Sequence, residues 1–171
     1  DNEFSSESYE QLEHIPESVR DIDRIGREDF TNIESFTLDG KNTKDMDDAI
    51  SCYINEKGNY VLMDHITDMG TIVPYGTPLD SDGFKKGNSY YPGGIVFPNY
   101  PRKIANGIGS LNMGVDRLTI SDVLEITPDG KVVSYRWVPS VIHSQLKMDY
   151  DTVNKIFKEG VVPSEYSDHE M

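Results

Sequence analysis

The protein has 171 residues, with 16 Lys and Arg against 30 Asp and Glu, and a formal net charge of −14 at pH 7. This balance argues against a DNA-coating protein and against docking on an anionic membrane surface, because both need clustered basic charge. The single cysteine excludes an internal disulfide framework, and no apolar run approaches the ~18–20 residues of a membrane span, so we expect a globular domain of the cytoplasm.

The first predicted elements follow a polar, charged lead-in segment, residues 1–30. Within it, Val19, Ile22 and Ile25 are spaced three apart, which predicts a short helix over 18–27. The period then changes, since apolar and polar residues alternate over 32–39, which predicts a strand.

Two hairpins are predicted further along the chain. Their strands are 49–55 and 59–66, and then 117–127 and 131–137, with Gly-containing turns between them. The stretch 70–115 is rich in Gly and Pro and is predicted to be a long, ordered loop, a feature that is often functional. A helix is predicted over 149–158, before a tail at 161–171. These elements predict a strand-rich α/β (α+β) domain over 31–160, with a mixed sheet and a few helices.

Four carboxylates gather between two predicted strands, at Asp39, Asp45, Asp47 and Asp48. If the chain is extended from Asp45 to Asp47, both of these side chains point to one side. Converging carboxylates repel one another unless a cation neutralises them, and oxygen ligands favour Mg²⁺ or Mn²⁺ over zinc. The alternative is a solvated acidic turn. A calcium EF-hand is excluded, because no ligand or Gly follows at the required spacing.

A second candidate site is the tyrosine pair Tyr90-Tyr91 beside a Pro-Gly-Gly turn. Such rings can stack on nucleobases, and Lys85, Lys86 and Arg102 flank them as candidate phosphate contacts. The alternative is ordinary packing of the rings.

Two further residues have simpler interpretations. His65 lies in a predicted strand beside Asp64 and Asp68 and could act as a ligand or base, although a hydrogen-bonded, half-buried histidine is the favoured interpretation. Cys52 lies in the middle of a predicted strand and is expected to be a small core residue.

Five segments together resemble the catalytic domain of the ribonuclease II/ribonuclease R exoribonucleases, and the bacterial ribonuclease R branch most of all. They are TLDGKNTKDMDDAI, YVLMDHITDMGTIVPYGTPLD, NSYYPGGIVFPNYP, NGIGSLNMGVDRLTIS and DGKVVSYRWVPSVIHS. The resemblance implies that 31–160 is the amino-terminal half of such a domain. It also implies Mg²⁺-dependent hydrolysis of single-stranded RNA from the 3′ end to nucleoside 5′-monophosphates.

The resemblance also assigns roles to residues. The four aspartates become the active-site carboxylates, with Asp39 and Asp48 as direct metal ligands, Asp45 aiding the site and Asp47 orienting the water or a second ion. Tyr90 matches the tyrosine that stacks near the 3′-terminal base, or Tyr91 does if the loop shifts by one.

Several positions depart from the family pattern. Asn99-Tyr100 replaces the usual Met-Leu before Pro101, Gly83 stands where Ala is usual, and Thr67 and Gly70 stand where Ala and Ser are common. The family's catalytic domain is also about twice as long. Its later half, which carries active-site arginines, and its oligonucleotide-binding domains are therefore expected in a parent protein, and the isolated chain is expected to be weak or inactive. The alternative function is a non-catalytic RNA-binding or protein-interaction module that kept the fold.

Overall fold

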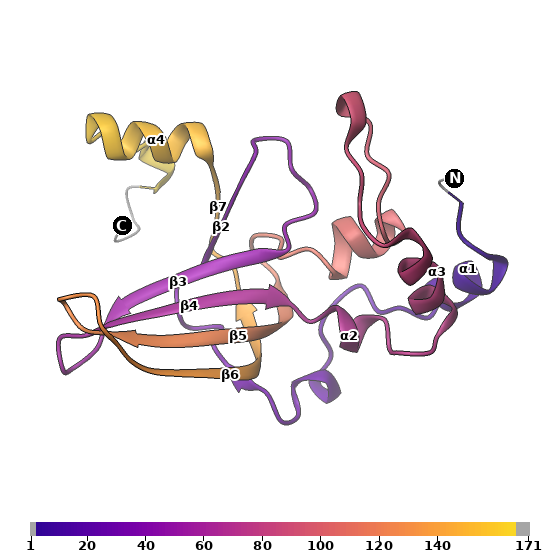
Figure 1. The fold of residues 1–171 in the computed structure, drawn as a ribbon, viewed down its shortest axis with the longest axis horizontal. Coiled ribbons are helices and arrows are strands. Elements are labelled where there is room, and N and C mark those ends of the chain that lie inside the picture. The colour runs from indigo at the N-terminus through magenta and orange to yellow at the C-terminus, as the bar shows by residue number, and fades with distance from the viewer. Residues whose placement is uncertain (1–2, 167–171) are drawn as a thin grey trace.

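The computed structural model describes residues 3–166 of the chain. Its strands are β1 (Glu28–Asp29), β2 (Phe36–Asp39), β3 (Asp48–Ile54), β4 (Tyr60–Thr67), β5 (Asp116–Ile126), β6 (Val132–His143) and β7 (Leu146–Asp149). Its α-helices are α1 (Ser6–Leu12), α2 (Met69–Ile72), α3 (Pro78–Lys86) and α4 (Tyr150–Glu159). The strands form one seven-stranded sheet in the order β1-β6-β5-β4-β3-β2-β7, with α1, α2 and α3 at one end and α4 over the β2–β7 edge (Figure 1). The predicted fold class is confirmed.

The sheet is mixed because its two outer pairs differ from its centre. Strands β2 to β6 are antiparallel, whereas β1 runs parallel to β6 and β7 runs parallel to β2. Both predicted hairpins are present as β3–β4 and β5–β6. Strand β6 is longer than predicted and continues through Pro139, which is tolerated because β1 pairs only with Ser140 and Val141.

Two predictions near the amino terminus are wrong. The segment 18–27 forms only a 3₁₀ turn, Asp21–Arg24, because Ile22 and Ile25 remain 64% and 73% exposed and find no core to pack against. The strand predicted over 32–39 begins only at Phe36, since the amide of Ile33 donates to the carbonyl of Phe30 in a turn.

The stretch 70–115 is not a continuous loop. It contains the end of α2, all of α3 and a π-helical turn, Ile104–Ile108. Helix α3 begins at Thr77, whose hydroxyl accepts from the amide of Asp80, and ends at Gly87, whose φ of +73° suits glycine. These capping signals define the helix, whereas the Gly and Pro content of the stretch obscured it.

The two faces of the central strands differ. One face packs a core around Ala49, Val61 and Met63, while α4 covers only the β2–β7 edge of the other face. The rest of that second face is open, with Ile54 65% and Trp137 61% exposed. Cys52 is also exposed, so the expectation of a core cysteine is wrong. Among the described residues, no helix is long and apolar enough to cross a membrane.

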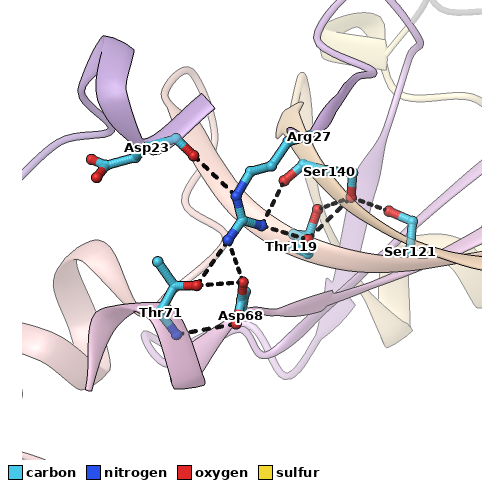
Figure 2. Close-up of polar contacts among 7 residues, drawn as sticks. All are labelled: Asp23, Arg27, Asp68, Thr71, Thr119, Ser121 and Ser140. Carbon is cyan, nitrogen blue, oxygen red and sulfur yellow. Dashed lines mark hydrogen bonds and ion pairs between the residues drawn. The ribbon is translucent and has the colours of Figure 1, made fainter. Parts of the chain in front are cut away.

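A buried arginine joins the amino-terminal segment to the sheet and to α2. The guanidinium of Arg27 donates to the carbonyls of Thr119 and Ser140 at 3.2 and 3.4 Å, and it forms an ion pair with Asp68 (Figure 2). Asp68 in turn accepts from the amide of Thr71 and so caps α2. Burial opposes its charge, but the hydrogen bonds from Arg27 and Thr71 leave the pKa of Asp68 below its ordinary value. Residues of β5, β6 and α2 are therefore tied to one side chain.

A second buried carboxylate joins α1 to α3. Asp82 accepts from the amide and hydroxyl of Ser5 at 2.8 and 2.7 Å, and from the hydroxyl of Ser8 at 2.7 Å. These hydrogen bonds, led by that from the Ser5 amide, hold the pKa of Asp82 far below its ordinary value. Leu12 of α1 then packs with Leu79 of α3 and with Ile104 in a second core cluster.

We expect Arg27→Met to lower the free energy of unfolding by at most about 3–5 kcal/mol, because it leaves the Asp68 carboxylate, whose side chain is 13% exposed, without its cation. The double variant Arg27→Met/Asp68→Asn should recover part of that loss, since neither buried charge remains. Denaturant unfolding of both single variants and the double variant checks this through a double-mutant cycle. Additive losses would show that the two side chains act independently.

We expect the α1–α3 contact to be acid-sensitive. Because the native pKa of Asp82 is depressed below 3.8, the native state binds fewer protons than the unfolded state below that pH. The stabilisation is therefore complete above 3.8 and is lost as the pH falls toward the native pKa. Thermal unfolding of wild type and Asp82→Asn over acidic pH values should show their difference shrinking, while Asp80→Asn serves as the control on the same helix. A pH-independent difference would contradict this origin.

Candidate active site

The acidic loop between β2 and β3, residues 40–47, is anchored by a methionine. The Met46 side chain is 2% exposed, its amide donates to the Ser110 hydroxyl at 3.0 Å, and its carbonyl accepts from the Leu111 amide at 2.8 Å. The Ser110 hydroxyl also donates to the Lys44 carbonyl at 2.9 Å. The loop is therefore held to the core at the residue between two aspartates.

Asp45 and Asp47 line the same cavity as a result. Successive residues of an extended segment point to opposite sides, so burying Met46 places its two neighbours on the other side. The cavity has a volume of about 290 Å³. Its lining consists of Asp45, Asp47, Ile66, Thr67, Met69, Asn88, Ser89, Asn99, Tyr100 and Ala105. The expected orientation of these two carboxylates is present.

Asp39 and Asp48 lie close to this pair but do not line the cavity. They stand at the end of β2 and at the start of β3. Desolvation, and then the charge of Asp48, raise the pKa of Asp39. Desolvation, followed by the charges of Asp45, Asp48 and Asp39, likewise raises the pKa of Asp47. The four aspartates thus form one mutually repelling group.

The four aspartates have the oxygen ligands that a hard cation prefers, but their side chains do not converge closely enough in this structure to hold one. Within residues 3–166, no three acidic, histidine or cysteine side chains converge on a point where they could hold one metal ion. However, Oδ2 of Asp39 is buried without a hydrogen-bond partner, and desolvation, followed by repulsion, raises the pKa values of Asp39 and Asp47. A bound cation would satisfy that oxygen and remove the repulsion once the carboxylates draw together.

A hairpin-like segment, residues 90–97, stands beside the acidic loop (Figure 1). Tyr90 and Phe97 pair at its base through two backbone hydrogen bonds of 3.0 and 2.9 Å. The hydroxyl of Tyr91 donates to Oδ2 of Asp45 at 2.6 Å, and this hydrogen bond raises the pKa of Tyr91. Of the two candidate tyrosines, Tyr91 is therefore the one that contacts the acidic loop.

Tyr90 belongs to a different hollow, with a volume of about 460 Å³. This basic groove is lined by Lys85, Lys86, Asn88, Tyr90, Pro92, Phe97 and Pro98. Three of the five predicted RNA contacts thus lie together, and Asn88 lines both the groove and the acidic cavity. Arg102 instead donates to the carbonyl of Val96 at 3.3 Å, which supports the hairpin-like segment.

The cavity also contains residues that were noted only as departures from the family pattern. Thr67, Asn99 and Tyr100 all line it. Tyr100 fits because position 83 is glycine, since a Cβ there would lie 2.6 Å from Cε1 of Tyr100. The two departures at 83 and 100 therefore compensate each other. In the sequence, the departures from the family pattern at 67, 99 and 100 were the one sign of the residues that form this wall of the cavity.

His65 takes no part in this site. It is fully buried, and its Nε2 and Nδ1 lie 3.0 and 2.6 Å from the hydroxyls of Ser51 and Ser121. Burial lowers its pKa to about 4, so it is neutral at pH 7. The interpretation of a hydrogen-bonded histidine is confirmed, but His65 is fully buried rather than half-buried.

Comparisons with known proteins identify the family of the chain. Residues 27–169 match the RNB domain. The chain belongs to the RNB domain family. It is 41% identical to Ribonuclease R 1 of Lactococcus lactis over 155 residues, which is 91% of this chain and 19% of that protein. The resemblance to the ribonuclease II/ribonuclease R exoribonucleases is thereby confirmed, and the chain spans about a fifth of this relative's length.

Several solved structures share the fold. Mycoplasma genitalium RNase R in complex with ribose-methylated single-stranded RNA superposes with a TM-score of 0.86 at 24% identity, over 95% of this chain and 25% of that one. Its complex with double-stranded RNA gives 0.84 at 25% identity, over 96% and 30%. Yeast Ssd1, described as a pseudonuclease, gives 0.77 at 17% identity, over 85% and 18%. The fold therefore occurs both in RNase R and in a pseudonuclease.

We expect Mg²⁺ or Mn²⁺ to raise the melting temperature of the chain more than NaCl of equal ionic strength. A ligand bound only by the native state adds about 2.7 kcal/mol at a hundredfold excess over Kd. Asp39→Asn should raise the melting temperature in EDTA by relieving repulsion, and it should reduce the response to Mg²⁺. Differential scanning calorimetry checks both effects, and an equal response to Mg²⁺ and NaCl would show simple screening instead.

Proposed function

We propose that this chain is the aspartate-bearing part of a 3′-to-5′ exoribonuclease that hydrolyses single-stranded RNA to nucleoside 5′-monophosphates with Mg²⁺, or alternatively Mn²⁺. The observation that carries the proposal is the placement of Asp45 and Asp47 on one cavity, with Asp39 and Asp48 beside them, in a chain of the RNB family. Ribonuclease R 1 of L. lactis supports the class of reaction through its name and its similarity.

The four aspartates would have different roles, according to their positions. Asp39 and Asp48, at the facing ends of two strands, would hold the cation, and Asp45 would complete its surroundings. Asp47, which lines the cavity, would orient the attacking water. When bound, divalent cations supply charge neutralisation and an acidified water to phosphodiester hydrolysis. The hydrogen bond from Tyr91 would hold Asp45 in place.

RNA would approach along the basic groove. Lys85 and Lys86 would contact phosphates there, and Tyr90 offers a ring for a base, while Tyr91 lies at the acidic cavity. Arg102 would support the hairpin-like segment beside this groove through its hydrogen bond to the carbonyl of Val96. The structure of M. genitalium RNase R with double-stranded RNA, at 25% identity, supports RNA as the partner.

The remaining machinery would come from the rest of a longer protein. We expect a second half of the catalytic domain and flanking oligonucleotide-binding domains there, as the resemblance implies. The isolated chain has a net charge of −14, which repels a polyanion at long range. Among the described residues, no arginine lines the acidic cavity, where it could face the charge developing on the scissile phosphate. We therefore expect it to be a poor ribonuclease by itself.

A second candidate function is a protein-interaction module without activity. The open sheet face favours it, because Ile54, Tyr135 and Trp137 are 65%, 72% and 61% exposed there, and exposed apolar residues on one face can dock a partner. The likeness to a pseudonuclease shows that the fold alone does not imply hydrolysis. The two functions differ in whether the aspartates are needed.

We expect a chimera to restore activity. Residues 27–166 would replace the matching part of L. lactis Ribonuclease R 1, and 5′-labelled RNA with a 3′ tail should then shorten from its 3′ end with Mg²⁺. Asp47→Asn in the chimera should keep RNA affinity but lose turnover, because its charge acts mainly in the transition state.

The control is Asp129→Asn, which makes the same charge change in the β5–β6 turn and should leave turnover intact. A chimera that folds and binds RNA but never shortens it would support the interaction module instead. Equal turnover of Asp47→Asn and wild type would exclude Asp47 from catalysis.

A further inference from the structure

The open face of the sheet is apolar over four neighbouring strands. Directly opposite residues of antiparallel strands share a face, so the pairing of β3, β4, β5 and β6 defines this one. It runs from Ile50, Cys52 and Ile54 on β3 to Tyr135 and Trp137 on β6, and the described strands place no basic side chain on it. An apolar sheet face is stable when another layer of structure buries it.

Helix α4 shows how the covered part of this face is built. Phe36 of β2 pairs with Ile50 of β3 and with Leu146 of β7, so these strands continue the same face. There, Val153 and Ile156 of α4 pack over the β2–β7 edge (Figure 1). Strands lie about 4.8 Å apart and packed helices about 8–10 Å apart, so one helix covers two strands. The four open strands therefore have room for two further helices beside α4.

Two carboxylates interrupt this apolar face in its middle. Asp64 of β4 and Asp122 of β5 lie directly opposite each other, where like charges repel. Within residues 3–166 neither of them forms an ion pair, and Oδ1 of Asp122 is buried without a hydrogen-bond partner. Desolvation, followed by the charges of Asp48 and Asp122, raises the pKa of Asp64. A positive group between the two would satisfy that oxygen and offset the repulsion.

We propose that a helical segment of the longer protein lies on this face and places one arginine or lysine between Asp64 and Asp122, an assignment that rests on the proposed function. The rest of the segment's inner side is apolar, to match Ile54, Tyr135 and Trp137. Arginine fits the pair best, because its planar guanidinium presents several N–H donors and can bind two carboxylates at once. Covering the face in this way would also remove the surface on which the alternative interaction module depends.

Other occupants match this face less well. A polyanion such as RNA is repelled, because this part of the described chain offers it carboxylates and no basic side chain. In a symmetric dimer the same patch meets itself, so each copy would bury its acidic pair without supplying a cation. L. lactis Ribonuclease R 1 matches this chain over only 19% of its own length, so a relative of this kind has ample further sequence to supply the segment.

The covering segment would also reach the candidate active site. Ile66, two residues beyond Asp64 on the same strand and the same face, lines the acidic cavity. Its direct partner on β3 is Asp48, the first residue of that strand. Two residues of a strand span about 7 Å, so a helix held by Asp64 and Asp122 lies beside the cavity. The ion pair is then a positioning contact between two parts of the catalytic domain.

The single cysteine of the chain reports whether this face is covered. Cys52 is exposed on it, and iodoacetamide modifies exposed thiols. Its alkylation rate, read from the mass of the Cys52 peptide, is compared between the 171-residue chain and the protein expressed from its complete reading frame. The complete protein should react at least about ten-fold more slowly, because modification then requires local opening. Equal rates would overturn the proposal, as would a reading frame that adds no further segment.

The near-isosteric Asp64→Asn and Asp122→Asn separate an ion pair from apolar covering alone. In the 171-residue chain each should raise the melting temperature by about 2–4 °C, because it relieves the repulsion. In the complete protein each should instead lower the protection of Cys52 at least about five-fold, because the cation loses a partner. Protection is the ratio of the two alkylation rates for the same variant, which cancels any direct effect of the substitution on the thiol.

Asp129→Asn, in the β5–β6 turn, is the control and should change neither the melting temperature nor the protection. Full protection of Cys52 in both variants would show that the segment needs no cation. A lowered melting temperature of the 171-residue chain would show that the pair already has a partner within it. Either result overturns the assignment. None of these measurements uses RNA, so a failed ion pair and a failed exoribonuclease proposal remain distinguishable.

Discussion

The ion pair between Arg27 and Asp68 is the contact on which the candidate site depends. Its guanidinium bridges carbonyls of β5 and β6, and its carboxylate partner caps α2 (Figure 2). Thr67 and Met69, the residues on either side of Asp68, form part of the cavity wall beside Asp45 and Asp47. This largely buried charge pair thus connects the amino-terminal segment to one wall of the acidic cavity.

The parts of the fold that sequence patterns predict are those set by neighbouring residues. Alternation over two hairpins identifies β3–β4 and β5–β6, since each strand pairs with the next one along the chain. Helix α1 depends instead on Asp82, 74 residues away from Ser8, and no local pattern reveals such a contact. The helix predicted over 18–27 had the right spacing but no core against which to pack Ile22 and Ile25.

In the candidate site, too, the features set by neighbouring residues could be predicted, whereas those set by contacts between distant segments could not. The spacing of Asp45, Met46 and Asp47 predicts two carboxylates on one side, and the buried Met46 produces this arrangement. Which tyrosine meets the acidic loop depends on how the hairpin-like segment pairs, and the pairing of Tyr90 with Phe97 leaves Tyr91 free to reach Asp45. The unpartnered atoms of Thr67 and Asn99 depend on packing between distant segments, so the sequence carries only an indirect trace of them in its departures from the family pattern.

The places where buried polar groups destabilise the fold help to distinguish a ligand-binding site from a protein-interaction surface. Buried polar atoms without partners occur at Asp39, Thr67 and Asn99 at or near the cavity, and also at Thr37 and Asp122 away from it. Desolvation, followed by repulsion, raises the pKa of Asp39 and Asp47. A fold kept only as an interaction module would gain stability by losing these groups, since neutral or apolar replacements remove their desolvation cost. The open sheet face does not require these groups, because its exposed apolar residues could dock a partner whichever residues replaced the four aspartates. The desolvation and repulsion at Asp39 and Asp47 are therefore the costs that a divalent cation, as proposed, would relieve, and an interaction module would have no use for them.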